Sequence, residues 1–172
     1  MVPLLLAVTA FVPMLLEAVR SRGNERRLRA RGALEPAGDV YAAMQVVYPA
    51  GFAALIAEAA VHRRTVDGAF AVGAVVFAAG KLIKYWAVAS LGPRWTFRVL
   101  VVPGTPLIRY GPYAYARHPN YVGVMGELSG MALMAGARWT GPIVLLVFAV
   151  LLAARIRVEE RALRTGSSAP PL

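Results

Sequence analysis

The stretch AFAVGAVVFAAGKLIKYWAVASL, residues 69–91, decides the fold class of this protein. Its only charged side chains are Lys81 and Lys84, and the rest of the run is almost entirely apolar. A helix needs about 20 consecutive apolar residues to cross the hydrocarbon core of a bilayer. A run of this length and composition therefore predicts a membrane-spanning helix.

Other apolar runs repeat this pattern. Of the 172 residues, 58% are hydrophobic, more than the roughly half expected of a soluble domain. Residues 2–19 and 41–61 approach spanning length, whereas 121–137 and 141–154 are shorter and nearly adjacent. We interpret the last two as a tight helical hairpin whose second helix continues to residue 160. The sequence predicts an all-α integral membrane protein, one domain over residues 1–172, with about five transmembrane helices at 2–19, 41–61, 69–91, 121–137 and 141–160.

Basic residues are concentrated on one side of the predicted membrane. Six arginines lie in the first connection, four between the third and fourth helices, and four in the C-terminal segment. The opposite side would hold only Arg63, Arg64 and Arg138. Because an excess of Lys and Arg marks cytoplasmic loops, we expect the N-terminus outside and the C-terminus in the cytoplasm. The net charge of +10 then reflects topology and attraction to anionic membrane lipids, and we expect no nucleic-acid partner.

The composition also bears on several kinds of chemistry. The sequence contains no cysteine, so a thiolate nucleophile is excluded. His62 and His118 are its only histidines, and they lack the spacing of zinc motifs, so we predict no metal site. The first run has neither a basic segment before it nor a small-residue cleavage site, which favours a retained helix over a signal peptide.

The connection GPRWTFRVLVVPGTPLIRYGPYAYARHPN, residues 92–120, cannot be one long helix. Its repeated prolines and glycines break helical hydrogen bonding. A loop of this length in a compact domain is usually functional or disordered, and its aromatic and β-branched residues favour a functional role. Its end places Arg117, His118 and Asn120 beside the fourth helix. Residues 165–172 are expected to fray.

Charged residues also occur inside the apolar runs. Such groups are costly in lipid, so each is a functional candidate. Glu17, Lys81 and Lys84 could be structural, with the lysines extending to the headgroups. Glu127 lies in GELSG, a Gly-xxx-Gly pattern that permits close helix contact within or between chains, which would allow a homo-oligomer. It could be a site residue or a structural partner of Lys84, and the role of Glu58 stays open.

The segment ARIRVEERAL, residues 154–163, continues the fifth helix. Arg155 and Glu159 are four residues apart, as are Glu160 and Arg164, so each pair would share a helical face. Such a pattern is most often a solvated surface. It would also emerge beside the 92–120 loop, which makes a binding site an alternative.

These motifs together resemble a known family. PLIRYGPYAYARHPNYVG, residues 106–123, followed by a helical hairpin and RIRVEERAL, resembles the isoprenylcysteine carboxyl methyltransferase family of integral membrane methyltransferases. The stretch LLEAVRSRGNERRLRARGALE, residues 15–35, is similar to its small bacterial members, whose proposed substrates include phenolic and pyrone lipids. The resemblance implies S-adenosylmethionine as cofactor, S-adenosylhomocysteine as product, and the cytoplasmic membrane of a bacterium as location.

The resemblance also implies site residues. Arg155 matches the arginine that faces the methyl acceptor and would be catalytic. Lys84, where some members carry a substrate-contacting arginine, Glu127 and Arg157 are expected to contact the substrate. Family members usually continue with an FGxxYxxY-like segment after the paired glutamates, where this chain reads RTGSSAPPL. The expected cofactor-binding residues are Leu107, Ile108, Tyr113, His118, Pro119, Asn120, Tyr121 and Glu159.

The expected function is methyl transfer to an anionic oxygen of a lipophilic acceptor at the cytoplasmic membrane face. Displacement at a sulfonium needs alignment and exclusion of water more than covalent help from the protein. A carboxylate or an acidic enol is already ionised at neutral pH and needs no general base, and a nearby Arg155 would lower its pKa further. A simple phenol would need that help far more. The alternatives are a phospholipid-type N-methyltransferase, an NADPH-dependent membrane reductase with a similar RHPNYxG-like segment, and a non-enzymatic membrane scaffold.

Overall fold

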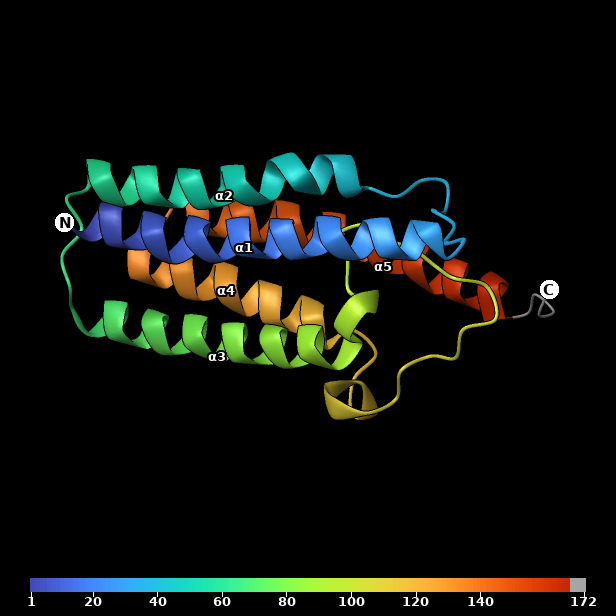
Figure 1. Cartoon of the computed structure of the whole chain (residues 1–172). Coiled ribbons are helices and arrows are strands. Elements are labelled where there is room, and N and C mark those ends of the chain that lie inside the picture. Colours follow the sequence, from blue (N-terminus) through green and yellow to red (C-terminus); the bar gives the residue numbers. More distant parts are fainter. Residues whose placement is uncertain (168–172) are drawn as a thin grey trace.

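The computed structural model describes residues 1–167 and shows five long helices. Figure 1 shows them lying along one another as a bundle. The predicted all-α class is confirmed. Of the predicted frayed tail, residues 165–167 belong to the last helix, and residues 168–172 lie outside the described residues. The helices are α1 (Val2–Ala30), α2 (Tyr41–Val61), α3 (Gly68–Leu91), α4 (Pro119–Ala135) and α5 (Thr140–Ser167), with the short 3₁₀ turns η1 (Gly92–Arg94) and η2 (Gly111–Ala114) between α3 and α4.

The first helix is longer than predicted. It continues through the basic segment to Ala30, so the predicted end at residue 19 is wrong. Ser21, Asn24 and Leu28 are buried at helical spacing, while Arg26 and Arg27 are exposed. One face of this extension is therefore buried although it is largely polar. The 92–118 connection holds Ser21 and Asn24, which the sequence pattern alone could not reveal.

Four helices, namely α1, α2, α3 and α5, are long and apolar enough to cross a membrane. The chain is therefore a helical membrane protein. The fifth helix, α4, has 17 residues, which is about the lower limit for a span. α4 is not one of the four, and it packs closely against α3.

Glycines bring α3 and α4 into backbone contact. A Cβ atom on Gly80 of α3 would lie 2.7 Å from the backbone nitrogen of Glu127, and one on Gly130 of α4 would overlap the backbone of Phe77. A Cβ on Gly126 would meet the Cα of Gly80 at 3.0 Å. The predicted close contact at the Gly-xxx-Gly pattern is thus found within the chain, and a homo-oligomer remains a prediction.

Glu58 anchors the turn between α4 and α5 to α2. Its carboxylate accepts hydrogen bonds from the backbone N–H groups of Arg138 at 2.8 Å, Trp139 at 3.2 Å and Thr140 at 2.8 Å. The hydroxyl of Thr140 donates a fourth at 2.6 Å. These donors include the start of α5, whose first N–H groups have no partner within the helix. The open question about Glu58 is therefore answered by a structural role.

We expect Glu58→Ala to lower the free energy of unfolding by about 3 kcal/mol, because it leaves several donors without their charged acceptor. Thermal unfolding in detergent measures this loss. Glu160→Gln is the control, because that partly exposed carboxylate lies 3.4 Å from His118 and 3.7 Å from Arg117, which are loose contacts. Equal melting temperatures for Glu58→Ala and the parent would contradict the assigned role.

Candidate functional site

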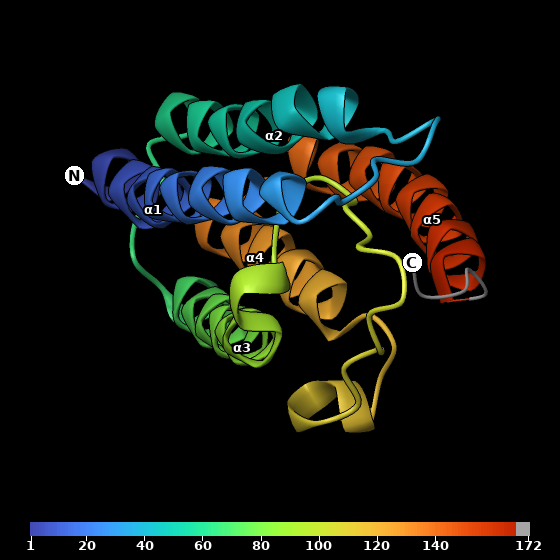
Figure 2. The ribbon, with the colours of Figure 1, turned by 45° about the vertical axis from the view of Figure 1, so that its right-hand side comes forward.

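Three segments meet at one end of the bundle. Figure 1 places the 31–40 connection, the 92–118 connection and the C-terminal half of α5 at the end opposite the N-terminus. Figure 2 shows the 92–118 connection crossing this end from α3 toward α5 before it returns to α4. No helix longer than four residues interrupts this connection, as its prolines and glycines predict.

A cavity of about 860 Å³ lies at this end. Its volume is within the range of about 300–1,000 Å³ typical of small-molecule sites. Pro119 is buried as the first residue of α4 and does not line the cavity. The other expected cofactor and catalytic residues do line it, namely Leu107, Ile108, Tyr113, His118, Asn120, Tyr121, Arg155 and Glu159.

The HPNY segment and the paired glutamates meet in the wall of this cavity. Pro119 begins α4, so His118 lies just before the helix and Tyr121 within its first turn. The two rings stack at a centroid distance of 5.5 Å and an angle of 15°. The Tyr121 hydroxyl donates to Glu159 Oε2 at 2.5 Å, and His118 Nε2 lies 3.4 Å from Glu160 Oε1.

Tyr113 adds a neutral aromatic side chain to the same wall. Burial raises the pKa of its hydroxyl above the usual value, and the nearby carboxylate of Glu159 raises this pKa further. Tyr113 therefore stays protonated at physiological pH. It offers an aromatic face and a hydroxyl group, and it cannot act as a phenolate base.

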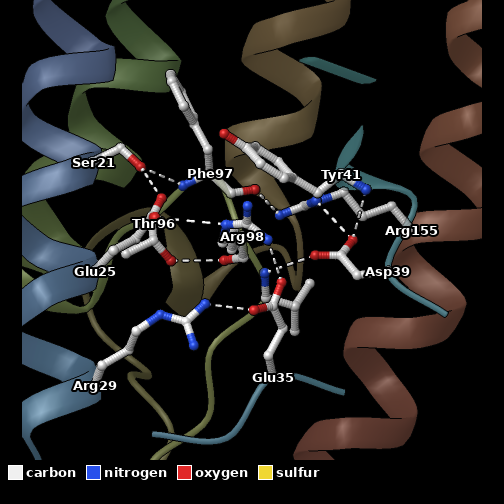
Figure 3. A network of polar contacts seen from close by, with 11 residues as sticks. Ser21, Glu25, Arg29, Glu35, Asp39, Tyr41, Thr96, Phe97, Arg98 and Arg155 are labelled. Carbon is white, nitrogen blue, oxygen red and sulfur yellow. Dashed lines mark hydrogen bonds and ion pairs between the residues drawn. The ribbon is translucent and has the colours of Figure 1, made fainter. Parts of the chain in front are cut away.

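Arg155 is buried between α5 and the two connections, with 5% of its surface exposed. Its Nε donates to the Tyr121 hydroxyl at 3.0 Å, its Nη1 to Asp39 Oδ1 at 3.0 Å, and its Nη2 to the Phe97 carbonyl. Figure 3 shows Arg155 reaching Asp39 and Phe97 from α5. The side chain thus links the HPNY segment to both connections.

Asp39 is the residue of this network that the sequence reasoning missed. Besides Arg155, its carboxylate accepts from the backbone N–H groups of Val99 and Tyr41, each at 3.1 Å. An aspartate just before a helix is a known start signal, and α2 begins at Tyr41. That local signal could have marked Asp39 as a cap, but its ion pair with Arg155 forms only in the folded chain.

Hydrogen bonds attach the 92–118 connection to the extension of α1. Asn24 donates to the Trp95 carbonyl at 2.8 Å, and Ser21 Oγ accepts from the Phe97 N–H at 2.8 Å. A backbone pair joins Leu34 to Val101 at 2.8 and 3.0 Å. These contacts explain why α1 continues past the apolar run.

Glu35 links Arg29 of α1 to Arg98 of the 92–118 connection (Figure 3). Its carboxylate accepts from Arg29 at 2.5 Å and from Arg98 at 2.6 Å. Burial raises the pKa of Glu35, but the hydrogen bonds from Arg29 and Arg98 outweigh burial and hold the pKa below its usual value. Glu35 therefore remains ionised and holds the basic loop in place.

A second cavity of about 270 Å³ lies mainly between α1 and α2. Most of its wall is apolar, with Met14, Leu15, Met44, Phe148 and Leu152 among its residues. The two cavities share the residues at which they meet, namely Trp95, Thr96, Asn120, Tyr121 and Arg155.

Asn120 carries an unpaired polar atom at this shared wall. Its Oδ1 is buried and has no hydrogen-bond partner within the described part of the chain. Buried polar atoms are normally hydrogen-bonded, so this oxygen is available to a ligand at the junction of the two cavities.

The residues expected to contact the substrate differ in whether they line a cavity. Lys84 lines the smaller cavity, whereas Glu127 and the exposed Arg157 line neither cavity. Lys84 Nζ lies 2.5 Å from Glu17 Oε2 and 3.3 Å from Glu127 Oε1. The predicted pairing of Lys84 with Glu127 is thus present.

Lys81 completes a buried charge cluster of four residues. Its Nζ lies 3.2 Å from Glu17 Oε1 and 3.1 Å from Glu127 Oε2. The interpretation of the lysines as groups reaching the headgroups is therefore wrong, because both carboxylates hold them inside the bundle. Among residues 1–164, no group of three or more His, Cys, Asp or Glu side chains is arranged to hold a metal ion.

The fold and the cavities define a helical membrane protein with a ligand site at one end of the bundle. A family model described as the isoprenylcysteine carboxyl methyltransferase family matches residues 71–165. The chain is 33% identical over 163 residues to the uncharacterized protein YpbQ of Bacillus subtilis, covering 95% of this chain and 97% of YpbQ. It is 26% identical over 141 residues to an uncharacterized protein of Haemophilus influenzae, covering 81% and 82% of the two chains. No solved structure matches the chain.

The chain belongs to the isoprenylcysteine carboxyl methyltransferase family. The family resemblance inferred from the motifs is confirmed. The family consists of membrane methyltransferases, and its members use S-adenosylmethionine. The match includes the 92–118 connection, α4, Arg155 and Glu159, whereas Asp39 lies before the matched residues.

Proposed function

We propose that this protein transfers a methyl group from S-adenosylmethionine to an oxygen atom of a lipophilic acceptor. The observation that carries the proposal is the meeting of two different cavities at Asn120, Tyr121 and Arg155. The larger cavity is rich in polar groups and suits a soluble cofactor. The smaller one is mainly apolar and suits the acceptor.

The residues around the larger cavity fit the cofactor. Bound S-adenosylmethionine supplies an electrophilic methyl group on a sulfonium cation. Glu159 offers carboxylate oxygens to ribose hydroxyls or an amino group. Tyr113 and Tyr121 offer aromatic faces to the adenine or to the cation. The unpaired Asn120 Oδ1 offers an acceptor where the two cavities meet.

Arg155 would orient the acceptor oxygen. A guanidinium has five N–H donors, and three of them make the contacts with Tyr121, Asp39 and Phe97. The remaining donors can bind an oxygen of the acceptor, such as that of an acidic enol or phenol, at the shared wall. The buried side chains of Trp95 and Arg155 at the shared wall would limit the access of water to the reacting atoms, as methyl transfer requires.

The acceptor would enter from the bilayer between α1 and α2. Leu15 lines the smaller cavity and is 66% exposed on the outside of the bundle. An exposed apolar residue on a spanning helix faces lipid, so we propose this side of the cavity as the path by which an apolar chain enters from lipid. A phospholipid amine would need an acidic group beside it to remove its proton, and Glu127 lines neither cavity.

The orientation proposed for the chain supports this assignment. The three arginine-rich segments lie at the same end of the bundle as the larger cavity (Figure 1). By the positive-inside rule we expect that end in the cytoplasm, where S-adenosylmethionine would be available.

Calorimetric titration of the detergent-purified protein with S-adenosylhomocysteine tests the proposal. We expect saturable binding that His118→Ala and Glu159→Gln each weaken about tenfold or more, because each loses a charged or directional hydrogen bond. Asp67→Asn is the matched control for Glu159→Gln, because it also removes one carboxylate. Asp67 caps the start of α3, which lies at the opposite end of the bundle.

Two results would contradict the proposal. Binding of NADPH in place of S-adenosylhomocysteine would support the reductase alternative. Absence of binding by either compound to folded protein would support the scaffold alternative. If binding occurs, methyl transfer from labelled S-adenosylmethionine to a bacterial lipid extract then identifies the acceptor.

A further inference from the structure

The pairing of Arg155 with Asp39 changes the charge that the smaller cavity presents. The guanidinium and carboxylate are 3.0 Å apart, and their side chains are 6% and 5% exposed. A buried pair at this distance is close to neutral as seen from the cavity. Arg155 therefore offers N–H donors at the shared wall without a free positive charge.

The other positive groups around this cavity also lie beside an equal number of negative groups. Lys84 belongs to the four-residue cluster, in which two lysines face two glutamates. At the outer rim, α1 contributes one residue of each sign, Arg22 and Glu25. Among the residues described, the wall thus has hydrogen-bond donors but no excess of buried positive charge.

We propose that Asp39 is a specificity-determining residue that keeps permanently anionic amphiphiles, such as fatty acids, from occupying the smaller cavity. The proposal rests on the proposed function only in treating this cavity as the acceptor site. A fatty-acid carboxylate would have to share Arg155 with Asp39 and would be repelled by it. An acceptor that arrives with a neutral hydroxyl meets no such repulsion.

The location of the cavity explains why selection against anionic amphiphiles would be needed. A site that opens toward lipid between α1 and α2 meets any membrane amphiphile whose chain fits. An unpaired buried guanidinium would bind the anionic ones strongly, because a charged partner left unpaired in a low-dielectric site is costly. Asp39 supplies that partner from within the chain.

Quenching of Trp95 fluorescence by brominated amphiphiles tests the proposal. Trp95 is 3% exposed and lines both cavities, and Trp86→Phe with Trp139→Phe leaves it as the only tryptophan. The probes are dibromostearic acid, at a pH where it is ionised, and the matching dibromostearyl alcohol. They differ in charge and share the same chain.

We expect the alcohol to quench Trp95 in the parent at lower concentrations than the acid does. Asp39→Asn should raise the affinity for the acid about tenfold or more, because it uncovers the guanidinium, and leave that for the alcohol unchanged. Asp39→Asn combined with Arg155→Gln restores neutrality and should return the acid affinity to the parent value. Asp39→Glu, which keeps the charge, should resemble the parent.

An acid affinity that is the same in the parent and Asp39→Asn, with alcohol binding intact, would overturn the proposal. So would quenching by neither probe in folded protein. If Asp39→Asn alone does not fold, Arg155→Gln is compared with the double variant, and the acid should bind more weakly to the single variant, which retains the unpaired carboxylate.

Titration of the same samples with S-adenosylhomocysteine separates this proposal from the proposed function. Asp39 lines neither cavity and acts through Arg155, so Asp39→Asn should still bind S-adenosylhomocysteine saturably. Loss of cofactor binding in every sample, including the parent, would count against the methyltransferase proposal. The comparison of acid and alcohol would still decide the role of Asp39.

Discussion

Replacing Gly130 with leucine is expected to abolish folding of the protein. A Cβ atom at this position would overlap the backbone of Phe77 on α3 and lie 2.7 Å from the carbonyl oxygen of Gly73. Overpacking against movable side chains costs about 1–3 kcal/mol, and a rigid helix backbone cannot move aside so easily. We expect little or no monodisperse protein after extraction, measured by size-exclusion chromatography and thermal unfolding. Gly80→Leu should act in the same way.

Gly23→Leu is the matched control for this prediction. Gly23 also lies within a helix, but a Cβ atom there would have no neighbour within 4 Å. This variant should fold with a melting temperature close to that of the parent. Normal folding of Gly130→Leu would show that α3 and α4 can separate without loss of the structure.

The second large effect is expected for Lys84→Met. This change leaves Glu17 and Glu127 with Lys81 as their single cationic partner among the described residues. Removing one member of a buried charge pair typically costs about 3–5 kcal/mol, because the remaining charge is left uncompensated. We expect a loss of stability of this size, measured by thermal unfolding in detergent.

A double variant distinguishes charge balance from packing. Lys84→Met with Glu127→Gln removes one charge of each sign, and the amide can still accept the hydrogen bond that the Tyr48 hydroxyl donates to Glu127 at 2.8 Å. It should recover most of the lost stability. If the double variant is no more stable than Lys84→Met, the lysine acts through its packing and not through its charge.

Much of the fold could be predicted from local patterns in the sequence. The apolar runs predicted five long helices, and the prolines and glycines of residues 92–118 predicted the long irregular connection. The end of α1 was misplaced because its extension, from Arg20 to Ala30, is polar on both faces. Only contacts with the 92–101 segment explain why Ser21 and Asn24 are buried.

The candidate site was predictable to the extent that its residues lie in motifs. RHPNY and the paired glutamates indicated a family and a cofactor site, and the structure brings His118, Tyr121 and Glu159 together at one cavity. Asp39 could not be found in this way. It lies before the matched family region and belongs to no motif with Arg155.

The sequence by itself determined the helices, the class of membrane protein and the family, because these depend on hydrophobic runs, helix-breaking residues and short motifs. Apart from the predicted pair of Lys84 and Glu127, the tertiary structure alone decided which partners the buried charges have. Glu17 with Lys84, Glu58 with the turn before α5, and Asp39 with Arg155 each join residues that are far apart in the chain. Such pairs form because a buried charge needs a partner, and the packing of the helices determines which partner lies within reach.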